Sequence, residues 1–188
     1  MDANELGSEL SKILVTEAEL KARLAEMARE IEADYAGAEQ PPLLVGVLKG
    51  AVMVMADLAR ELSFHAEMDW MAVSSYGAST KSSGVVRILK DLDTEIAHRD
   101  VLIVEDIIDS GLTLSWLKEN LESRGANSVR ICAMLRKPDA AKVEVDVAYV
   151  GFDIPTDFVV GYGLDYAERY RNLRDVGVLA EHVYADAG

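Results

Sequence analysis

The chain has 188 residues, of which 50% are hydrophobic and 28% are charged, and this composition is typical of one globular domain with a substantial core. The 19 Lys and Arg residues are outnumbered by 33 Asp and Glu residues, and the net charge of −14 disfavours binding to nucleic acid or to an acidic membrane surface. The single cysteine, Cys132, excludes an internal disulfide. This cysteine usage and an N-terminus without the pattern of a signal peptide predict a cytoplasmic protein. Together with the negative charge, they predict no nucleic-acid partner and no membrane partner.

The predicted elements alternate between helices and strands. Thr16 and Glu19 form a capping box before apolar residues that recur on one helical face, which predicts a helix over residues 17–35. The apolar run over residues 43–48 is too short for a helix and predicts a strand buried on both faces. The further elements predicted, in chain order, are a helix over 51–62, strands over 70–74 and 101–104, a helix bearing Leu114, Leu117 and Leu121 with Gly125 at its C-cap, and strands over 128–135, 147–152 and 158–162. This alternation predicts an α/β fold with a mostly parallel central sheet flanked by helices.

A polar segment over residues 75–84 interrupts the pattern with four serines and two glycines. A connection of this length in a compact domain is typically a functional lid or a disordered segment. Two interpretations stay open from these residues alone: a lid that closes over a binding site, and a hairpin with a mobile tip.

The segment over residues 101–113 carries the strongest functional signal. An apolar strand leads into Glu105 and Asp106, and after two isoleucines the segment 109–113 (Asp-Ser-Gly-Leu-Thr) opens a helix. In an open parallel sheet this strand-to-helix turn lies at the ligand-binding edge. Backbone N–H groups at the helix N-terminus with Ser and Thr hydroxyls suit a phosphate monoester, and the two carboxylates can accept hydrogen bonds from a vicinal diol. These are the requirements of a ribose 5-phosphate, although Asp109 or Ser110 could instead serve as a helix cap.

Other motifs in the chain are weak. His65, His98 and His182 are scattered and do not predict a zinc site. The Gly161-Tyr162-Gly163 run lacks the third glycine of a dinucleotide-binding fingerprint, and there is no Gly-Lys-Ser/Thr of a P-loop.

The segment over residues 104–111 (Val-Glu-Asp-Ile-Ile-Asp-Ser-Gly) resembles the phosphoribosyl pyrophosphate signature of the 6-oxopurine phosphoribosyltransferases. The other matches, in the family's order, are Leu48-Lys49-Gly50 with its pyrophosphate loop, Ser75-Tyr76-Gly77 with the opening of its mobile lid, and Arg136-Lys137-Pro138, residues 152–166 and residues 169–173 with its purine-binding hood. The similarity covers nearly the whole chain and is greatest to the bacterial hypoxanthine-guanine branch.

The resemblance implies a type I phosphoribosyltransferase fold and a reaction. We expect one domain over residues 1–188, with a small C-terminal hood formed mainly by about residues 150–188 together with the N-terminal segment. The implied reaction transfers the phosphoribosyl group from phosphoribosyl pyrophosphate to hypoxanthine or guanine, giving IMP or GMP plus pyrophosphate, with Mg²⁺ as cofactor. We also expect a homo-oligomer, either a dimer or a tetramer. A regulatory protein that binds phosphoribosyl pyrophosphate without catalysis and a xanthine-preferring enzyme are the alternatives.

The resemblance also implies roles for the sugar-phosphate residues. Glu105 and Asp106 would face the ribose hydroxyls, directly or through magnesium, and Asp109 would face purine N7 as the catalytic residue. The 5-phosphate would be held by Asp109, Ser110, Gly111, Leu112 and Thr113. Some relatives carry a lysine at the position of Leu112, so phosphate binding here would depend more on backbone donors.

A second set of residues would bind magnesium and pyrophosphate. Asp165 would help to hold the metal together with Glu105 and Asp106, and Arg171 would contact pyrophosphate. The further residues implied at this end of the site are Lys49 and Gly50 in the pyrophosphate loop and Ser75 and Tyr76 at the start of the lid.

The purine would be bound by three residues. Lys137 would donate to the exocyclic O6, Phe158 would stack on the ring, and Val159 would offer backbone contacts to the purine edge. Each residue also has a structural alternative: Lys137 could be solvated, Phe158 could be core, and Arg171 could pair with Asp165.

Overall fold

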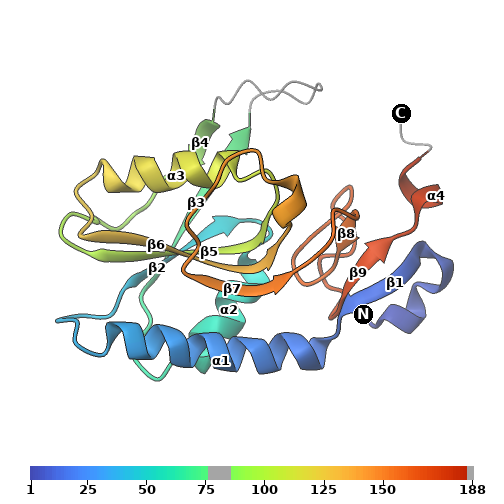
Figure 1. The fold of residues 1–188 in the computed structure, drawn as a ribbon, viewed down its shortest axis with the longest axis horizontal. Helices are drawn as coiled ribbons and strands as arrows, with labels where there is room; N and C mark the ends of the chain where they lie inside the picture. The colour runs from blue at the N-terminus through green and yellow to red at the C-terminus, as the bar shows by residue number, and fades with distance from the viewer. Residues whose placement is uncertain (76–85, 186–188) are drawn as a thin grey trace.

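The computed structural model describes residues 1–75 and 86–185 and contains an α/β fold built on a central sheet (Figure 1). Six strands of the described residues form this sheet in the order β4-β3-β2-β5-β6-β7, and each neighbouring pair is parallel except β3 with β4. Their bounds are β2 Leu43–Leu48, β3 Met68–Ser75, β4 Val86–Lys90, β5 Asp100–Ile108, β6 Ser128–Arg136 and β7 Tyr149–Asp153. The predicted fold class is therefore confirmed.

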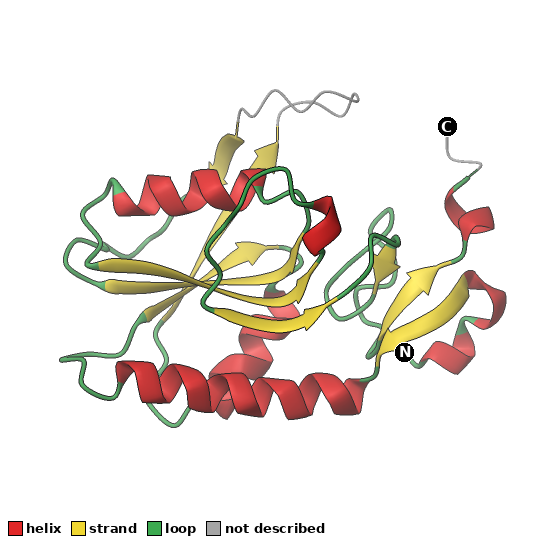
Figure 2. Cartoon of the chain, viewed as in Figure 1, coloured by secondary structure: helices red, strands yellow, loops and turns green. Residues whose placement is uncertain are grey.

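Helices cover both faces of this sheet (Figure 2). Helices α1 (Glu17–Tyr35) and α2 (Val52–Glu61) pack on one face, and α3 (Leu112–Glu122) packs on the other. Because side chains alternate along a strand, the two faces of β5 belong to different core clusters. Leu102 packs with α1 and α2, whereas Ile103 packs with α3. The apolar run of each central strand is explained by this double burial.

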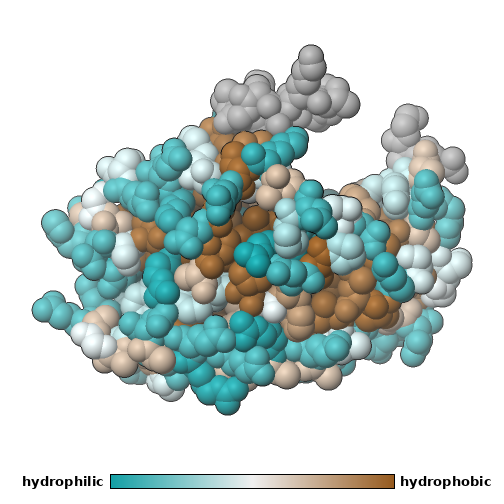
Figure 3. Space-filling view, viewed as in Figure 1, coloured by the Kyte–Doolittle hydropathy of each residue, from teal (hydrophilic) through white to brown (hydrophobic). Residues whose placement is uncertain are grey.

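Helix α1 has the predicted bounds. Thr16 Oγ1 accepts from the Glu19 backbone N–H at 3.3 Å, and the Glu19 carboxylate accepts from the Thr16 N–H at 2.8 Å. The side chains of its apolar face are buried, namely Leu20, Leu24, Met27, Ala28 and Ile31. The outward side of α1, along the lower edge of the molecule, is largely hydrophilic (Figure 3). The capping box and the amphipathic spacing were therefore sufficient to predict this element.

A second, antiparallel sheet lies beside the first and has the order β1-β9-β8. We call it the hood sheet. Its strands are β1 Leu10–Val15, β8 Val159–Val160 and β9 Val176–Leu179, and the short helix α4 (Glu181–Tyr184) follows β9. Single 3₁₀ turns occur over Ala3–Glu5, Gly7–Glu9 and Pro138–Ala140. The N-terminal strand thus pairs with a strand near the C-terminus, as Leu10 opposite Leu179 shows.

Some predicted bounds were wrong. Strand β5 does not end before the two carboxylates but continues to Ile108, because Ile107 and Ile108 extend its parallel ladder with β6. Helix α3 ends at Glu122, and Gly125 is not its C-cap but lies beyond it with a φ of 84°. The strand predicted over 158–162 is reduced to Val159–Val160.

No helix in the described part of the chain combines the length and the apolar character needed to cross a lipid bilayer.

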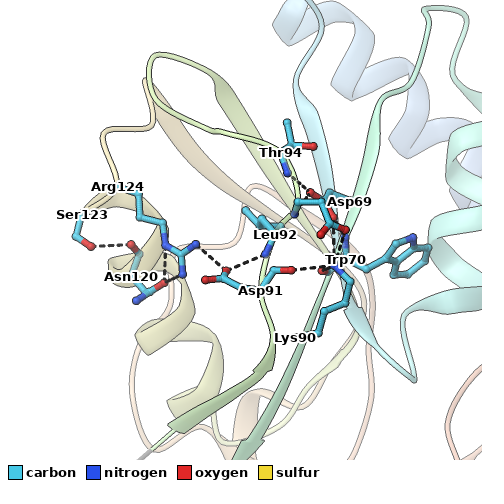
Figure 4. A network of polar contacts seen from close by, with 10 residues as sticks. Asp69, Trp70, Lys90, Asp91, Leu92, Thr94, Asn120, Ser123 and Arg124 are labelled. Carbon is cyan, nitrogen blue, oxygen red and sulfur yellow. Dashed lines mark hydrogen bonds and ion pairs between the residues drawn. The ribbon is translucent and has the colours of Figure 1, made fainter.

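A buried carboxylate connects the start of β3 to the loop that follows β4. Asp69 is 5% exposed, and its carboxylate accepts backbone N–H bonds from Trp70 at 2.7 Å, Asp93 at 2.9 Å and Thr94 at 2.8 Å (Figure 4). In the same loop Asp91 accepts from Arg124 at 2.7 Å, which ties the loop to the end of α3. Burial raises the pKa of Asp69, but the hydrogen bonds outweigh it and hold the pKa below its usual value.

Asp69→Asn should therefore destabilise the protein by about 1 to 3 kcal/mol, because an amide cannot replace a carboxylate that accepts N–H bonds on both oxygens. The pKa of Asp69 is lower in the folded protein than in the unfolded chain. Its contribution to the free energy of unfolding is therefore complete above the unfolded pKa of about 3.9, and it is lost only as the pH falls through the folded pKa. The deficit measured by urea denaturation should thus be constant between about pH 5 and 8. Asp93→Asn is the control, since that side chain is 85% exposed. A deficit equal to that of the control would contradict the assignment.

Candidate active site

Several predicted site residues lie at the carboxyl ends of four strands in the central sheet. Lys49 follows β2, Asp109 follows β5, Lys137 follows β6, and Ser75 is the last residue of β3. The carboxyl ends of parallel strands meet at one edge of a sheet, and here this edge is on the side of the hood sheet (Figure 1). Tyr76 and the rest of the expected lid lie outside the described residues.

A pocket of about 140 Å³ opens at the turn between β5 and α3. Its lining consists of Glu105, Ile107, Ile108, Asp109, Ser110, Gly111, Thr113 and Leu114. Gly111 is the N-cap of α3 with a φ of 78°, and a side chain there would come within 3.0 Å of the Val143 carbonyl oxygen. The left-handed conformation and the close approach together require glycine. Because Gly111 is the N-cap and no side chain donates or accepts a capping hydrogen bond there, neither Asp109 nor Ser110, of which Asp109 is exposed, caps the helix. Leu112, which was predicted to hold the phosphate, is outside the pocket lining.

Glu105 and Asp106 are the two half-buried carboxylates at this end of β5. Desolvation, followed by the charge of Asp106, raises the pKa of Glu105 well above its ordinary value. Desolvation also raises the pKa of Asp106, although the Ile107 N–H donates to its carboxylate at 2.8 Å and the charge of Arg171 opposes the shift. Both groups are costly to ionise in the free protein, so the site favours a ligand or cation that compensates their charge.

The turn after β2 packs against this carboxylate pair. A Cβ atom on Gly50 would lie 1.8 Å from Asp106 Oδ2, so the turn reaches the carboxylate only because residue 50 is glycine. Gly163 approaches the turn from the other side, and a Cβ atom there would lie 2.0 Å from the Gly50 carbonyl oxygen. Lys49, whose preceding peptide bond is cis, forms an ion pair with Glu168 at 3.0 Å. The segment that follows β8 is thereby held against the β2 turn.

Arg171 lies at the centre of an ion network in that segment. Its guanidinium donates to the Gly163 carbonyl at 2.8 Å and contacts Asp165 Oδ1 at 2.9 Å and Glu168 Oε1 at 3.1 Å. The remaining oxygen of Asp165 accepts the Glu168 backbone N–H at 2.8 Å. The alternative pairing of Arg171 with Asp165 therefore exists in this structure, and it places the expected pyrophosphate and metal residues side by side.

A second pocket, of about 200 Å³, adjoins the first. Its lining consists of Ile108, Asp109, Arg136, Lys137, Pro138, Ala141, Val143, Glu144, Val145 and Val147. Lys137 is 8% exposed, so it is not a solvated surface lysine, and its backbone N–H donates to the Ile108 carbonyl at 2.9 Å. Asp109 lines both pockets and lies at their boundary.

Phe158 and Val159 lie in the hood sheet region. Phe158 is 42% exposed, which excludes the core alternative, and its ring lies 5.3 Å from that of Tyr184 and 5.8 Å from that of Tyr166. Val159 is buried and pairs with Val178. Phe158 does not belong to the described lining of the pocket that contains Lys137, so the structure brings the sugar-phosphate and pyrophosphate residues together more closely than it does the purine residues.

Comparison with known proteins identifies the family. The model of the phosphoribosyl transferase domain matches residues 12–167. The chain belongs to the phosphoribosyltransferase family. It is 59% identical over 180 residues to a hypoxanthine-guanine phosphoribosyltransferase of Mycobacterium avium, covering 94% of this chain and 89% of the relative.

Solved structures of this phosphoribosyltransferase family agree with that match. A hypoxanthine phosphoribosyltransferase of Staphylococcus aureus has a TM-score of 0.91 at 43% identity, over 96% of this chain and 97% of that one. A Trypanosoma cruzi hypoxanthine phosphoribosyltransferase variant complexed with the product IMP has a TM-score of 0.89 at 41% identity, over 95% of each chain. The predicted type I phosphoribosyltransferase fold and the predicted family are confirmed.

Sequence reasoning missed several parts of this phosphoribosyltransferase site. The segment around Val143 and Glu144 forms a wall of the second pocket, and its backbone N–H groups at Lys142 and Val143 donate to the Ser110 carbonyl at 3.0 and 3.4 Å. Glu168 was also missed, because its partner Lys49 is 119 residues away. Gly163 was noted in a failed fingerprint and in the hood resemblance over residues 152–166, but without a structural reason. Its φ of 101° and its close approach to Gly50 explain the glycine.

Glu105→Gln should stabilise the free phosphoribosyltransferase near neutral pH, because it removes a carboxylate whose ionised form is penalised by burial. Because the pKa of Glu105 is higher in the folded protein than in the unfolded chain, the parent protein loses stability as the pH rises from the unfolded pKa of about 4.3 toward the folded pKa. The gain over the parent should therefore be larger at pH 8 than at pH 5.5, with each kcal/mol raising the Tm by about 2 to 4 °C. Glu119→Gln, on the exposed face of α3, is the matched control and should change the Tm little at either pH. A Glu105→Gln protein less stable than the parent at pH 8 would contradict this account.

Proposed function

We propose that this phosphoribosyltransferase transfers the 5-phosphoribosyl group from phosphoribosyl pyrophosphate to hypoxanthine or guanine, giving IMP or GMP and pyrophosphate, in purine salvage. The names of its relatives support this reaction, since they are hypoxanthine-guanine or hypoxanthine phosphoribosyltransferases, one of them with IMP bound. The geometry of the candidate site residues also supports it.

The position of Asp109 at the boundary of the two pockets carries the proposal. On one side lies the pocket of Ser110, Gly111 and Thr113, whose backbone and hydroxyl donors suit a 5-phosphate. On the other side lies the pocket lined by Lys137, which suits the O6 of a 6-oxopurine. A nucleoside monophosphate that occupied both pockets would place the imidazole edge of its purine next to Asp109. That carboxylate can then accept or hold the proton at N7 while the bond to the sugar forms.

The charges around the carboxylate pair match the expected transition state. Loss of pyrophosphate from the anomeric carbon builds positive charge on the ribose and negative charge on the leaving group. Glu105 and Asp106 lie where they can stabilise the ribose, and Lys49 and Arg171 lie beside them where they can stabilise the leaving group. A direct displacement of this kind requires no covalent intermediate.

Magnesium fits these residues as a metal shared with the substrate. Among the described residues no group of three or more His, Cys, Asp or Glu is placed to hold a metal alone. Mg²⁺ commonly binds one or two carboxylates together with substrate phosphates and water, and Glu105, Asp106 and Asp165 are carboxylates of this kind. When bound, the ion would neutralise charge on the pyrophosphate as that group leaves. Asp165 would then have to exchange its contact with Arg171 for the metal.

We further propose that residues 1–188 act as one catalytic domain, that its hood comprises about residues 150–188 with the N-terminal segment, and that the enzyme is a cytoplasmic homo-oligomer. The pairing of β1 with β9 supports the inclusion of the N-terminal strand in the hood. Light scattering on the purified protein distinguishes a dimer from a tetramer.

The experiment that tests the reaction is a comparison of four bases. The purified protein is incubated with Mg²⁺, phosphoribosyl pyrophosphate and hypoxanthine, guanine, xanthine or adenine, and the nucleotide formed is quantified by chromatography. We expect IMP and GMP as the main products. Efficient xanthine turnover would favour a xanthine-preferring enzyme, and binding of phosphoribosyl pyrophosphate with no turnover of any base would favour the regulatory alternative.

A further inference from the structure

The carboxylate of Glu168 bridges the two cations that the proposed reaction assigns to pyrophosphate. Its Oε2 lies 3.0 Å from Lys49 Nζ, and its Oε1 lies 3.1 Å from an Arg171 nitrogen. Each carboxylate oxygen thus faces a different cation, one from the β2 turn and one from the segment after β8. A pyrophosphate that approached the same two cations would present its oxygens to the same donors.

The backbone around Glu168 holds its side chain in this place. Glu168 has a φ of 62° and Ala167 a φ of 50°, a left-handed conformation that costs free energy for residues other than glycine. The Glu168 N–H donates to Asp165 Oδ2 at 2.8 Å, which stabilises the turn. The chain therefore adopts a disfavoured local geometry that directs a glutamate toward the two cations.

Glu168 is not needed to position Arg171. The guanidinium keeps the Gly163 carbonyl at 2.8 Å and Asp165 at 2.9 Å as independent partners. Lys49 differs, because within the described residues Glu168 is the only partner recorded for its ammonium group. Removal of the Glu168 charge should leave Arg171 in place and free Lys49.

We propose that Glu168 is an internal competitor of pyrophosphate, which occupies Lys49 and Arg171 in the free enzyme and takes them back as the product leaves. This inference rests on the proposed function, because it assigns these cations to the leaving group. Glu168 thereby weakens the binding of phosphoribosyl pyrophosphate and of product pyrophosphate, and it assists product release.

The size of the effect follows from the exposure of the pairs. Lys49 and Glu168 side chains are both 65% exposed, so solvent screens their attraction and each pair contributes modestly. The contact with Lys49, followed by that with Arg171, lowers the pKa of Glu168, which keeps the carboxylate ionised at neutral pH. Loss of the competing charge should tighten pyrophosphate binding by about three- to tenfold.

The test is Glu168→Gln, which keeps the shape of the side chain and removes its charge. Isothermal titration with magnesium pyrophosphate should give a Kd about three- to tenfold lower than that of the parent. The KM for phosphoribosyl pyrophosphate should fall, and kcat should stay equal or fall as product release slows. An unchanged or higher Kd for pyrophosphate would overturn the inference, because a purely positioning role for Glu168 predicts weaker binding.

Two further variants make the result specific. Glu39→Gln removes the same charge from an exposed position before β2, at the opposite end of that strand from Lys49. This control should leave the Kd for pyrophosphate within about twofold of the parent value. In a Lys49→Met background the gain from Glu168→Gln should shrink, because one of the two contested cations is gone. An equal gain in that background would contradict competition for Lys49.

The failure of this inference can be told from failure of the proposed function. If the parent converts hypoxanthine to IMP but Glu168→Gln does not bind pyrophosphate more tightly, only the inference fails. If the parent converts no purine base, the proposed function fails, and tighter pyrophosphate binding by the variant still supports competition at these cations.

Discussion

Asp109→Asn should lower kcat by about 10²- to 10⁴-fold, which is the usual value of general acid or base assistance, while the Kd for phosphoribosyl pyrophosphate changes little. Asp109 is exposed at the boundary of two pockets and makes no cap for α3. Within the part of the chain that the structure describes, the amide would therefore lose no helix-capping contact. The proton at purine N7 needs a base as charge moves during the transfer. The amide oxygen of asparagine can accept a hydrogen bond but is too weakly basic to take the proton.

The measurement for Asp109→Asn is a pair of values, kcat from steady-state turnover of hypoxanthine and Kd from titration with phosphoribosyl pyrophosphate. Asp146→Asn is a matched control, because Asp146 is exposed on the neighbouring loop and is outside the lining of both pockets. The control should retain the parent values. If kcat of Asp109→Asn is unchanged and the affinity for phosphoribosyl pyrophosphate collapses, Asp109 is a binding or structural residue instead.

Adenine should be rejected by roughly 10⁴-fold or more in kcat/KM relative to hypoxanthine and guanine, because of Lys137. A lysine ammonium has three donors and no acceptor, so it satisfies the O6 of a 6-oxopurine but opposes the 6-amino group of adenine. Lys137 is 8% exposed, so water can do little to satisfy its charge when the ligand does not. Stacking on Phe158 cannot discriminate, because every purine presents a similar face.

Lys137→Ala should remove most of this discrimination by lowering turnover of the 6-oxopurines far more than that of adenine. Lys142→Ala is the control, since Lys142 is an exposed lysine of the loop beside the second pocket. The comparison requires kcat/KM for adenine, hypoxanthine and guanine in all three proteins. Strong rejection of adenine that survives in Lys137→Ala would move the selectivity to other groups, with the backbone at Val159 the next candidate.

Elements with strong local signals could be predicted from the sequence. Helix α1 has a capping box at Thr16 and a regular apolar face, and β2 is a short apolar run between a proline pair and a glycine turn. The turn around Gly111 was predictable for the same reason, since its acids, hydroxyls and glycine are contiguous in the chain. The end of β5 was not, because Glu105 and Asp106 have the polar character of a strand terminus while the ladder with β6 continues past them.

Features that depend on distant partners could not be predicted in this way. No strand was predicted over residues 10–15, and this segment forms strand β1 because β9, far along the chain, pairs with it. The pairing of Lys49 with Glu168 has no local signal, since tertiary structure alone brings the two side chains together. The family resemblance supplied roles for Lys49 and Arg171, but it did not predict that a carboxylate already occupies both in the free protein.

The most direct test of the central claim is the stoichiometry of the reaction with hypoxanthine. The purified protein is mixed with Mg²⁺, phosphoribosyl pyrophosphate and hypoxanthine, and IMP and pyrophosphate are quantified in the same samples over time. A transferase with the proposed site should release one pyrophosphate for each IMP, and Asp109→Asn should slow both products equally. Pyrophosphate released without IMP, or no release of either product by the parent protein, would contradict the assignment of this sheet edge as a phosphoribosyl transfer site.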